Sequence, residues 1–126
     1  AMIAYAFHSV PGFSKFGSYV GNASTDGPFV FCGFRPAYIL YKKSSAAGTP
    51  WIVMDSVRNT YNPLGLYVLP DVTDAEATAD VFDFTANGFK LRSSHTYNNE
   101  SGATYIFMAF AESPFGGSGV AQARAR

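Results

Sequence analysis

The chain has 126 residues and a formal net charge of zero, with nine Lys plus Arg against nine Asp plus Glu. Charged residues make up 14% of it, against about 25% in an average soluble domain. The basic residues are scattered rather than gathered in a stripe, so we expect no nucleic-acid partner, because such binding gains from a positive face that releases counterions. No apolar run reaches about 18 residues, which predicts no membrane insertion.

Short apolar runs separated by Gly, Pro, Asn and Ser predict β-strands along the whole chain. Hydrophobic residues make up 48% of the chain and aromatic residues 17%, which is enough to build an ample core. We expect residues 1–126 to form one domain. Eight or nine strands at this spacing favour an all-β antiparallel sandwich, jelly-roll-like or lectin-like. The first and last strands are aromatic and low in charge, so we expect them to be paired rather than free edges. The expected strands are 2–8, 15–21, 29–31, 36–43, 51–55, 66–69, 81–84, 88–92 and 103–111.

Two local patterns refine this expectation. The run Phe82-Asp83-Phe84 and the run 89–92 alternate apolar and polar residues, and Asn87-Gly88 between them predicts a hairpin turn with positive φ. Residues 71–80 have the one helix-like composition, which allows at most one short helix capped by Asp71 or Thr73. The same stretch holds an acidic cluster, for which calcium binding is an alternative to the capped helix; its members are Asp71, Asp74, Glu76 and Asp80.

The two ends of the chain resemble each other. Ile3-Ala4-Tyr5-Ala6-Phe7, followed by Pro11 and Phe13, is similar to Ile106-Phe107-Met108-Ala109-Phe110, followed by Pro114 and Phe115. Both are aromatic strands that end in a proline turn. This predicts that residues 1–13 are the terminal strand of a preceding repeat, with one full unit present here.

Five segments in order along the chain resemble one family; they are 7–19 (FHSVPGFSKFGSY), 27–37 (GPFVFCGFRPA), 55–63 (DSVRNTYNP), 84–92 (FTANGFKLR) and 101–115 (SGATYIFMAFAESPF). The family is a repeated domain of uncharacterised function, found near the C-terminus of structural proteins of tailed phages and prophages. The resemblance implies a virion location and a tail-fibre or adhesin setting, and it supplies no catalytic residues. Residues 116–126, which begin Gly-Gly-Ser-Gly, are expected to be a flexible C-terminal arm.

The sequence does not indicate an enzyme. Its two histidines, His8 and His95, lack the spacing of a metal site, and no nucleophile elbow, phosphate loop or dinucleotide fingerprint is present. We therefore expect no catalytic residues, no metal and no cofactor. The single cysteine, Cys32, lies inside an apolar run and is interpreted as a buried packing residue.

Two loops carry the candidate binding residues. The first combines aromatic, carboxylate, guanidinium and amide groups, which is the set that stacks on a sugar ring and binds its hydroxyls. An Asp–Arg pair that fixes the loop, with asparagines in turns, is the structural alternative. The second loop, 95–102, joins the same surface if the strand ends converge. The candidates are Trp51, Asp55, Arg58, Asn59, Tyr61 and Asn62 in the first loop and Tyr97 and Asn98 in the second.

From these observations we expect a non-enzymatic, tail-fibre or receptor-binding type of domain that contacts a host-surface glycan or receptor through weak sites made avid by oligomerisation. Its expected partners include other virion proteins and further copies of itself, as a trimer if it stands in a fibre. The alternative is a structural module that caps, decorates or trimerises a fibre and meets protein alone. A glycan binder should expose aromatic groups beside Asp and Asn in a concave patch, whereas a capping module should present a large apolar face.

Overall fold

A computed structural model describes residues 1–115 of the chain. These residues form eight strands and one helical turn. The strands are β1 (Ser14–Val20), β2 (Phe29–Phe31), β3 (Pro36–Lys43), β4 (Ile52–Asp55), β5 (Leu64–Tyr67), β6 (Ala77–Thr85), β7 (Gly88–Leu91) and β8 (Thr104–Ala111), and the turn is α1 (Thr96–Asn99). The prediction of an almost entirely β domain with at most one short helix is confirmed.

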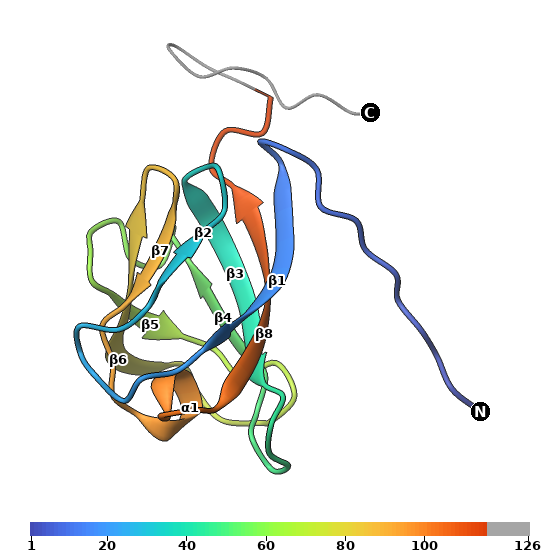
Figure 1. The fold of residues 1–126 in the computed structure, drawn as a ribbon, viewed down its shortest axis with the longest axis vertical. Coiled ribbons are helices and arrows are strands. Elements are labelled where there is room, and N and C mark those ends of the chain that lie inside the picture. The colour runs from blue at the N-terminus through green and yellow to red at the C-terminus, as the bar shows by residue number, and fades with distance from the viewer. Residues whose placement is uncertain (116–126) are drawn as a thin grey trace.

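The strands pack as two four-stranded antiparallel sheets (Figure 1), with the orders β1-β8-β3-β4 and β2-β7-β6-β5. The predicted β-sandwich is therefore confirmed. The pairs β1–β8 and β2–β7 join the two halves of the chain, as in a jelly roll. The edge strands β4 and β5 instead pair locally, in the hairpins β3–β4 and β5–β6.

Alternating side chains from both sheets fill the space between them, as the twofold period of a strand requires. Phe89 lies near the middle of this core, with its ring centroid 5.1 Å from that of Phe82 and 5.2 Å from that of Phe107. Burying a phenylalanine fully contributes about 2–3 kcal/mol. The strand β8 is central in its sheet, so the expectation that the last aromatic strand is paired on both edges is confirmed.

The predicted β6–β7 hairpin is present, but the reason given for its glycine is wrong. Thr85 pairs with Gly88 across a two-residue loop, and neither Asn87 nor Gly88 has a positive φ. The glycine is required by a close approach instead. A Cβ atom at Gly88 would lie 2.1 Å from the carbonyl oxygen of Val30, on the paired strand β2.

The short helix lies elsewhere than predicted. Residues 71–76 form turns and loop, and β6 begins at Ala77. The apolar residues of 71–80 are mainly alanine, which offers a helix little surface to bury, while Thr78 pairs with Leu66 on β5. The helical turn is α1, where the His95 side chain accepts a hydrogen bond from the Tyr97 backbone N–H.

The expected first strand, 2–8, is not a strand in the described structure. It runs away from the sandwich as an extended segment (Figure 1), and Met2, Ile3 and Tyr5 are 99%, 82% and 81% exposed. No place beside β8 is free for it, because β1 and β3 already pair with both edges of that strand. The segment meets the domain at Phe7, whose ring stacks on that of Phe16.

Three other expectations concern single features. Cys32 is 7% exposed, as its apolar surroundings predict, and burial raises the pKa of its thiol to about 12. Among the described residues, no helix is long and apolar enough to cross a membrane. The expected flexible arm, 116–126, lies outside the residues that the structure describes.

Removal of residues 1–6 should leave the sandwich intact, because these residues fill no place in its core. We expect the thermal midpoint to change by less than about 2 °C, as for a surface change. Circular dichroism melting of the full and shortened chains measures this. A fall of more than about 5 °C in the shortened chain would mean that the segment is part of this fold after all.

Candidate functional site

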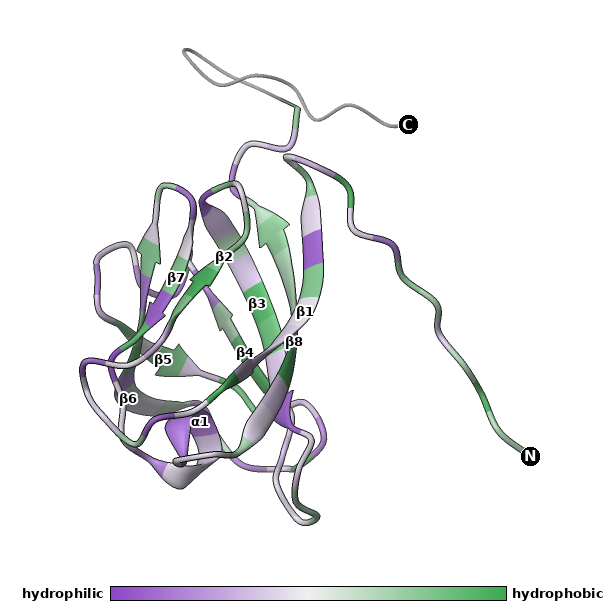
Figure 2. Cartoon of the chain, in the orientation of Figure 1, coloured by the Kyte–Doolittle hydropathy of each residue, from purple (hydrophilic) through white to green (hydrophobic). Residues whose placement is uncertain are grey.

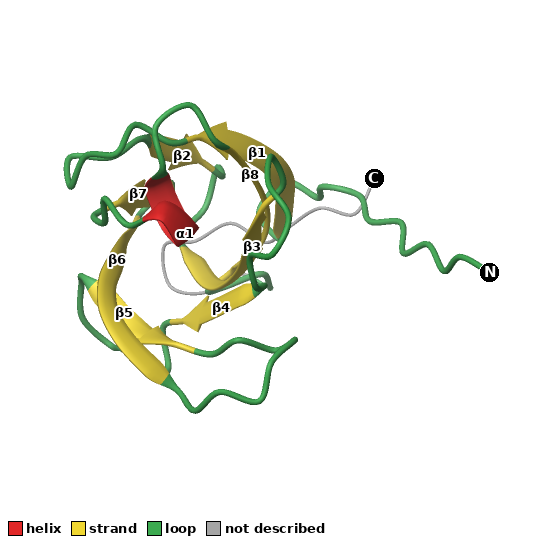
Figure 3. Ribbon diagram, turned by 90° about the horizontal axis from the view of Figure 1, so that it is seen from below, coloured by secondary structure: helices red, strands yellow, loops and turns green. Residues whose placement is uncertain are grey.

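Three buried tyrosines from one sheet hold α1 against the end of the sandwich. The hydroxyl of Tyr19 on β1 donates to the backbone oxygen of Asn98 at 2.9 Å, and that of Tyr41 on β3 donates to the Asn98 side-chain oxygen at 2.7 Å. Tyr105 on β8 donates to the backbone oxygen of Thr96 at 2.7 Å. Figure 3 shows α1 lying across this end, between the two sheets.

Asn99, which has no exposed surface, ties the neighbouring loops to α1. Its side-chain oxygen accepts from the backbone N–H of Asn22 at 2.8 Å. Its amide nitrogen donates to the backbone oxygens of Ser24 and Ser93 at 2.8 Å and 2.9 Å. A buried amide is stabilising only when its partners are present, and among residues 1–115 no buried side-chain nitrogen or oxygen lacks one. The chain on both sides of Tyr97 is therefore fixed.

The environment of these tyrosines keeps their hydroxyls protonated. Desolvation by burial raises the pKa of Tyr19 and of Tyr41 well above 10.0, and neighbouring tyrosines add to the effect. The pKa of Tyr105 is also raised by burial. Since the neutral hydroxyl is the form that donates a hydrogen bond, the contacts to α1 persist throughout the neutral range.

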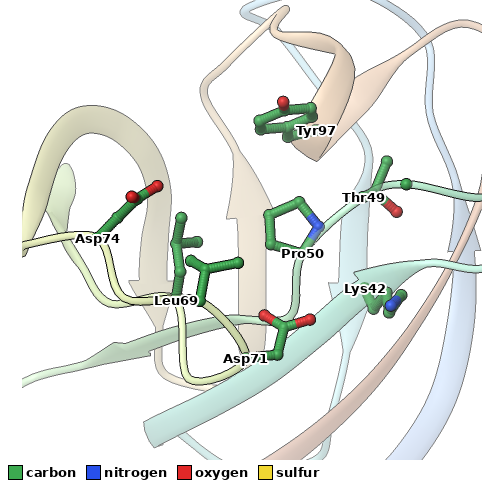
Figure 4. Close-up of a pocket in the computed structure, with 9 residues that line it drawn as sticks. Lys42, Thr49, Pro50, Leu69, Asp71, Asp74 and Tyr97 are labelled. Atoms are coloured by element: carbon green, nitrogen blue, oxygen red, sulfur yellow. The ribbon is translucent and has the colours of Figure 1, made fainter.

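An open cleft of about 470 Å³ lies beside α1. Figure 4 shows its labelled side chains around Pro50, with Tyr97 coming from α1 and Asp71 and Asp74 from the loop that follows β5. The cleft thus combines residues from three separate segments at one end of the sandwich. The full lining is Lys42, Gly48, Thr49, Pro50, Leu69, Asp71, Val72, Asp74 and Tyr97.

The cleft presents both aromatic and charged groups to a ligand. Tyr97 is 42% exposed, and its ring stands edge-on to His95. Among residues 1–115, no salt bridge engages Lys42, Asp71 or Asp74. A cleft with one ammonium group, two carboxylates and a half-exposed aromatic ring can bind a polar ligand that also has an apolar face.

Trp51 lies next to this cleft and helps to shape it. Its backbone N–H donates to a carboxylate oxygen of Asp71 at 3.0 Å, which fixes the loop after β5 against the start of β4. The ammonium group of Lys42 lies 5.6 Å from the centre of the Trp51 ring, within cation–π range. Of the candidates in the first loop, Trp51 is the one that contacts residues of the cleft, namely Asp71 and Lys42.

Among the other candidates in that loop, Asp55 ends β4 and the rest follow it, so the length of this four-residue strand, about 13 Å, separates them from Trp51. Asp55 accepts from the backbone N–H groups of Val57 and Arg58 at 3.0 Å and 2.8 Å, and it pairs with the Arg58 guanidinium at 3.2 Å. The side-chain oxygen of Asn59 accepts from the N–H groups of Gly65 and Leu66. These contacts are those of the structural alternative, in which an Asp–Arg pair and asparagines fix the loop.

Asn62 and Asn98 are also engaged within the protein, whereas Tyr61 is not. The Asn62 side chain accepts from the N–H of Phe84 and donates to its oxygen, both at 2.9 Å, and so continues the edge of β6. Asn98 is 5% exposed and bonds to Tyr41. Tyr61 is 84% exposed and lies outside the cleft.

The acidic cluster of the sequence separates in the structure. Asp71 and Asp74 line the cleft, Glu76 pairs with Arg58 at 3.5 Å, and Asp80 lies in β6. Among residues 1–115, no three His, Cys, Asp or Glu side chains gather as metal ligands would. Sequence reasoning thus singled out two cleft carboxylates, but as part of a short capped helix or a calcium site, and it missed Lys42 and Thr49, which carry no motif.

One family model matches the chain. It is described as Domain of unknown function (DUF7483), and it covers residues 1–114. No curated protein and no solved structure matches the chain. The matched stretch includes the extended N-terminal segment together with all eight strands, so both belong to one sequence pattern.

Replacing Asn62 should weaken the fold, whereas replacing Tyr61 should not. Asn62→Ala removes two hydrogen bonds to the edge of β6, which predicts a loss of about 1–2 kcal/mol in the free energy of unfolding. Tyr61→Ala removes an exposed side chain and should change it by less than about 0.5 kcal/mol. Urea denaturation of both variants tests this, and equal losses would contradict it.

The buried tyrosines should make the fold sensitive to alkali. An unfolded chain ionises Tyr19 and Tyr41 near pH 10.0, but their raised pKa values hold both neutral in the fold. The free energy of unfolding therefore does not depend on these tyrosines below that pH. Above it, the free energy of unfolding falls by up to about 1.4 kcal/mol per pH unit for each tyrosine. Urea denaturation across the alkaline range measures the slope of the free energy of unfolding against pH. Tyr41→Phe should reduce this slope by the share of one tyrosine, because one ionising group is lost. An unchanged slope in that variant would refute this account.

Proposed function

We propose that this chain, which belongs to the family Domain of unknown function (DUF7483), is a non-catalytic domain that binds a carbohydrate in the cleft beside α1. The observation that carries the proposal is the half-exposed ring of Tyr97 among Lys42, Asp71 and Asp74. An aromatic ring can stack on the apolar face of a pyranose, while carboxylates accept from its hydroxyls and an ammonium group donates to them.

The support of the cleft favours binding over a loose surface contact. Tyr97 stands between Thr96 and Asn98, which are both bonded to buried tyrosines. Asp71 is bonded to the backbone at Trp51. Because these groups are positioned before a ligand arrives, binding need not order them, and affinity gains from that preorganisation.

The position of the cleft suits a domain that touches a surface. Ser14 at the start of β1 pairs with Phe110 near the end of β8, so the chain enters and leaves the sandwich at one end. The cleft lies at the other end, beyond the start of β8, which is about 27 Å long. A domain attached by the first end would present the cleft outward.

We also propose that this domain belongs to a phage virion, in a tail fibre or a similar appendage that contacts the host surface. The support for this setting is the resemblance of the sequence to phage structural proteins, together with the position of the cleft at the end of the sandwich opposite to where the chain enters and leaves it. An open site of this kind binds a single glycan weakly, and several copies, as in a trimeric fibre, would raise the overall avidity. Host-surface glycans and other virion proteins are its proposed partners.

A purely structural module remains the second candidate, because one observation favours it. Residues 2–7 are apolar and largely exposed, which fits a contact with protein rather than with sugar. The two functions are compatible, since this segment leaves the sandwich at the end away from the cleft.

A glycan-array screen of the domain, presented as a multimer, tests the proposal. We expect binding to a defined glycan, and a loss of at least about tenfold in Tyr97→Ala and in Asp71→Asn; the second variant keeps an acceptor for the Trp51 N–H. Tyr61→Ala, which changes an exposed tyrosine outside the cleft, is the matched control and should bind as the parent does.

Circular dichroism and thermal melting establish that each variant is folded before its binding is scored. An array and host cells that both fail to bind the multimer would refute the carbohydrate proposal. Binding that is lost in Tyr61→Ala but kept in Tyr97→Ala would show that the glycan binds elsewhere, and it would refute the cleft as the binding site.

A further inference from the structure

The extended N-terminal segment, residues 2–7, makes little contact with the sandwich it precedes. Figure 2 shows apolar residues along it, and Met2, Ile3 and Tyr5 are more than four-fifths exposed. None of the backbone groups of residues 1–7 forms a hydrogen bond within the described part of the chain. A stretch of unpaired backbone with apolar side chains is the state of a strand that has no partner.

The sequence of this segment repeats that of β8 at one constant spacing. Ile3, Ala6, Phe7 and Pro11 correspond to identical residues in and after β8, which are Ile106, Ala109, Phe110 and Pro114. Neither 2–7 nor β8 contains a charged side chain.

The structure shows what this pattern does in β8. The strand bonds to β1 on one edge and to β3 on the other. Its inward residues, among them Ala109 with no exposed surface, lie in the core. Its outward residue Phe110 packs its ring 6.0 Å from Phe16 and 5.9 Å from Tyr38. A strand that is apolar on both faces and paired on both edges is a central strand, and such a strand is not stable alone.

The junction between the segment and β1 is held in place. The N–H of Phe16 donates to the Ser9 hydroxyl oxygen at 3.0 Å, and Val10 forms an isolated bridge with Ser14. The N–H groups of Phe13 and Ser14 both donate to the Val10 oxygen at 2.9 Å. The direction in which residues 2–7 leave the domain is therefore set by hydrogen bonds.

We propose that residues 2–8 form the β8-type central strand of a second β-sandwich of this kind, which precedes this one on the same polypeptide. The final strand of that unit continues directly into β1 of this domain through the turn at residues 10–13. The interaction surface is the strand itself, and its partner is a sandwich whose own β1-type and β3-type strands flank an open central place. This proposal does not depend on carbohydrate binding.

Two inward positions indicate how the partner differs from this domain. Met2 stands where β8 has the fully buried Tyr105. Ala4 stands where β8 has Phe107, whose ring lies 5.2 Å from that of Phe89 and covers Gly17. A partner that accepts Ala4 there fills the same space from its other strands. A copy of the present domain would accept Ala4→Phe better than the natural segment, because that change fills the cavity.

A tandem protein, in which residues 14–103 are followed directly by the full chain, tests the proposal. The first unit then lacks β8 and can be completed only by residues 1–9 of the second. Amide hydrogen exchange reports on residues 2–8. We expect exchange at the rate of an open chain in the full chain alone, and exchange slowed by at least about 100-fold in the tandem that carries Ala4→Phe, with smaller protection for the natural segment.

Two controls bracket the result. In two complete domains in series, the exchange of the natural β8 in the first domain gives the protection expected of a completed sandwich, with which residues 2–8 of the tandem are compared. Ala6→Asp, at the position of the fully buried Ala109, should abolish protection in the tandem, because it places a charge in the core. Open-chain exchange of residues 2–8 in both the natural and the Ala4→Phe tandems would overturn the proposal, as would protection that survives Ala6→Asp.

Discussion

The hydrogen bonds from three buried tyrosines to α1 are the constraint on which the rest of the site depends. Tyr19, Tyr41 and Tyr105 stand on three adjacent strands, and their rings belong to the core while their hydroxyls reach its end. Without partners, these hydroxyls would be desolvated at a cost of about 1–3 kcal/mol each. The four residues of α1 are too few to be stable as a free helix, so the turn and the tyrosines hold each other in place. The packing of the sandwich thereby sets the position of one exposed ring, Tyr97.

The cleft beside α1 joins parts of the chain that are distant in sequence. Lys42 lies near the end of β3, Asp71 follows β5 and Tyr97 lies in α1, after β7. None of these residues belongs to a motif in its own segment, and the chemistry arises because they meet at one end of a rigid framework. This arrangement is common in β-sandwiches, where strands provide stability and the loops at one end carry recognition.

The sequence predicted the strands better than it predicted the site, and the reason is physical. Strand position follows from alternation and turn residues, so β3 was predicted at its observed bounds. The segment 2–8 has the same pattern, but whether it is a strand depends on a partner that its own residues do not specify. The loop at the end of β4 has the composition of a sugar site, yet the side-chain oxygens of Asp55, Asn59 and Asn62 accept hydrogen bonds from backbone N–H groups of the domain itself. Composition cannot distinguish an amide that binds a ligand from one that closes a turn.

The antiparallel pairing of β1 with β8 also has a mechanical consequence. Because Ser14 and Phe110 are paired, a pulling force applied to the two ends of the sandwich acts on the same end of one ladder. The hydrogen bonds of that ladder would be loaded one after another, as in a zipper, rather than together in shear. Such a geometry resists tension poorly. The domain is thus poorly suited to a position in which tension passes through it from one end of the chain to the other. It is better suited to a position in which it is pulled by one chain end alone.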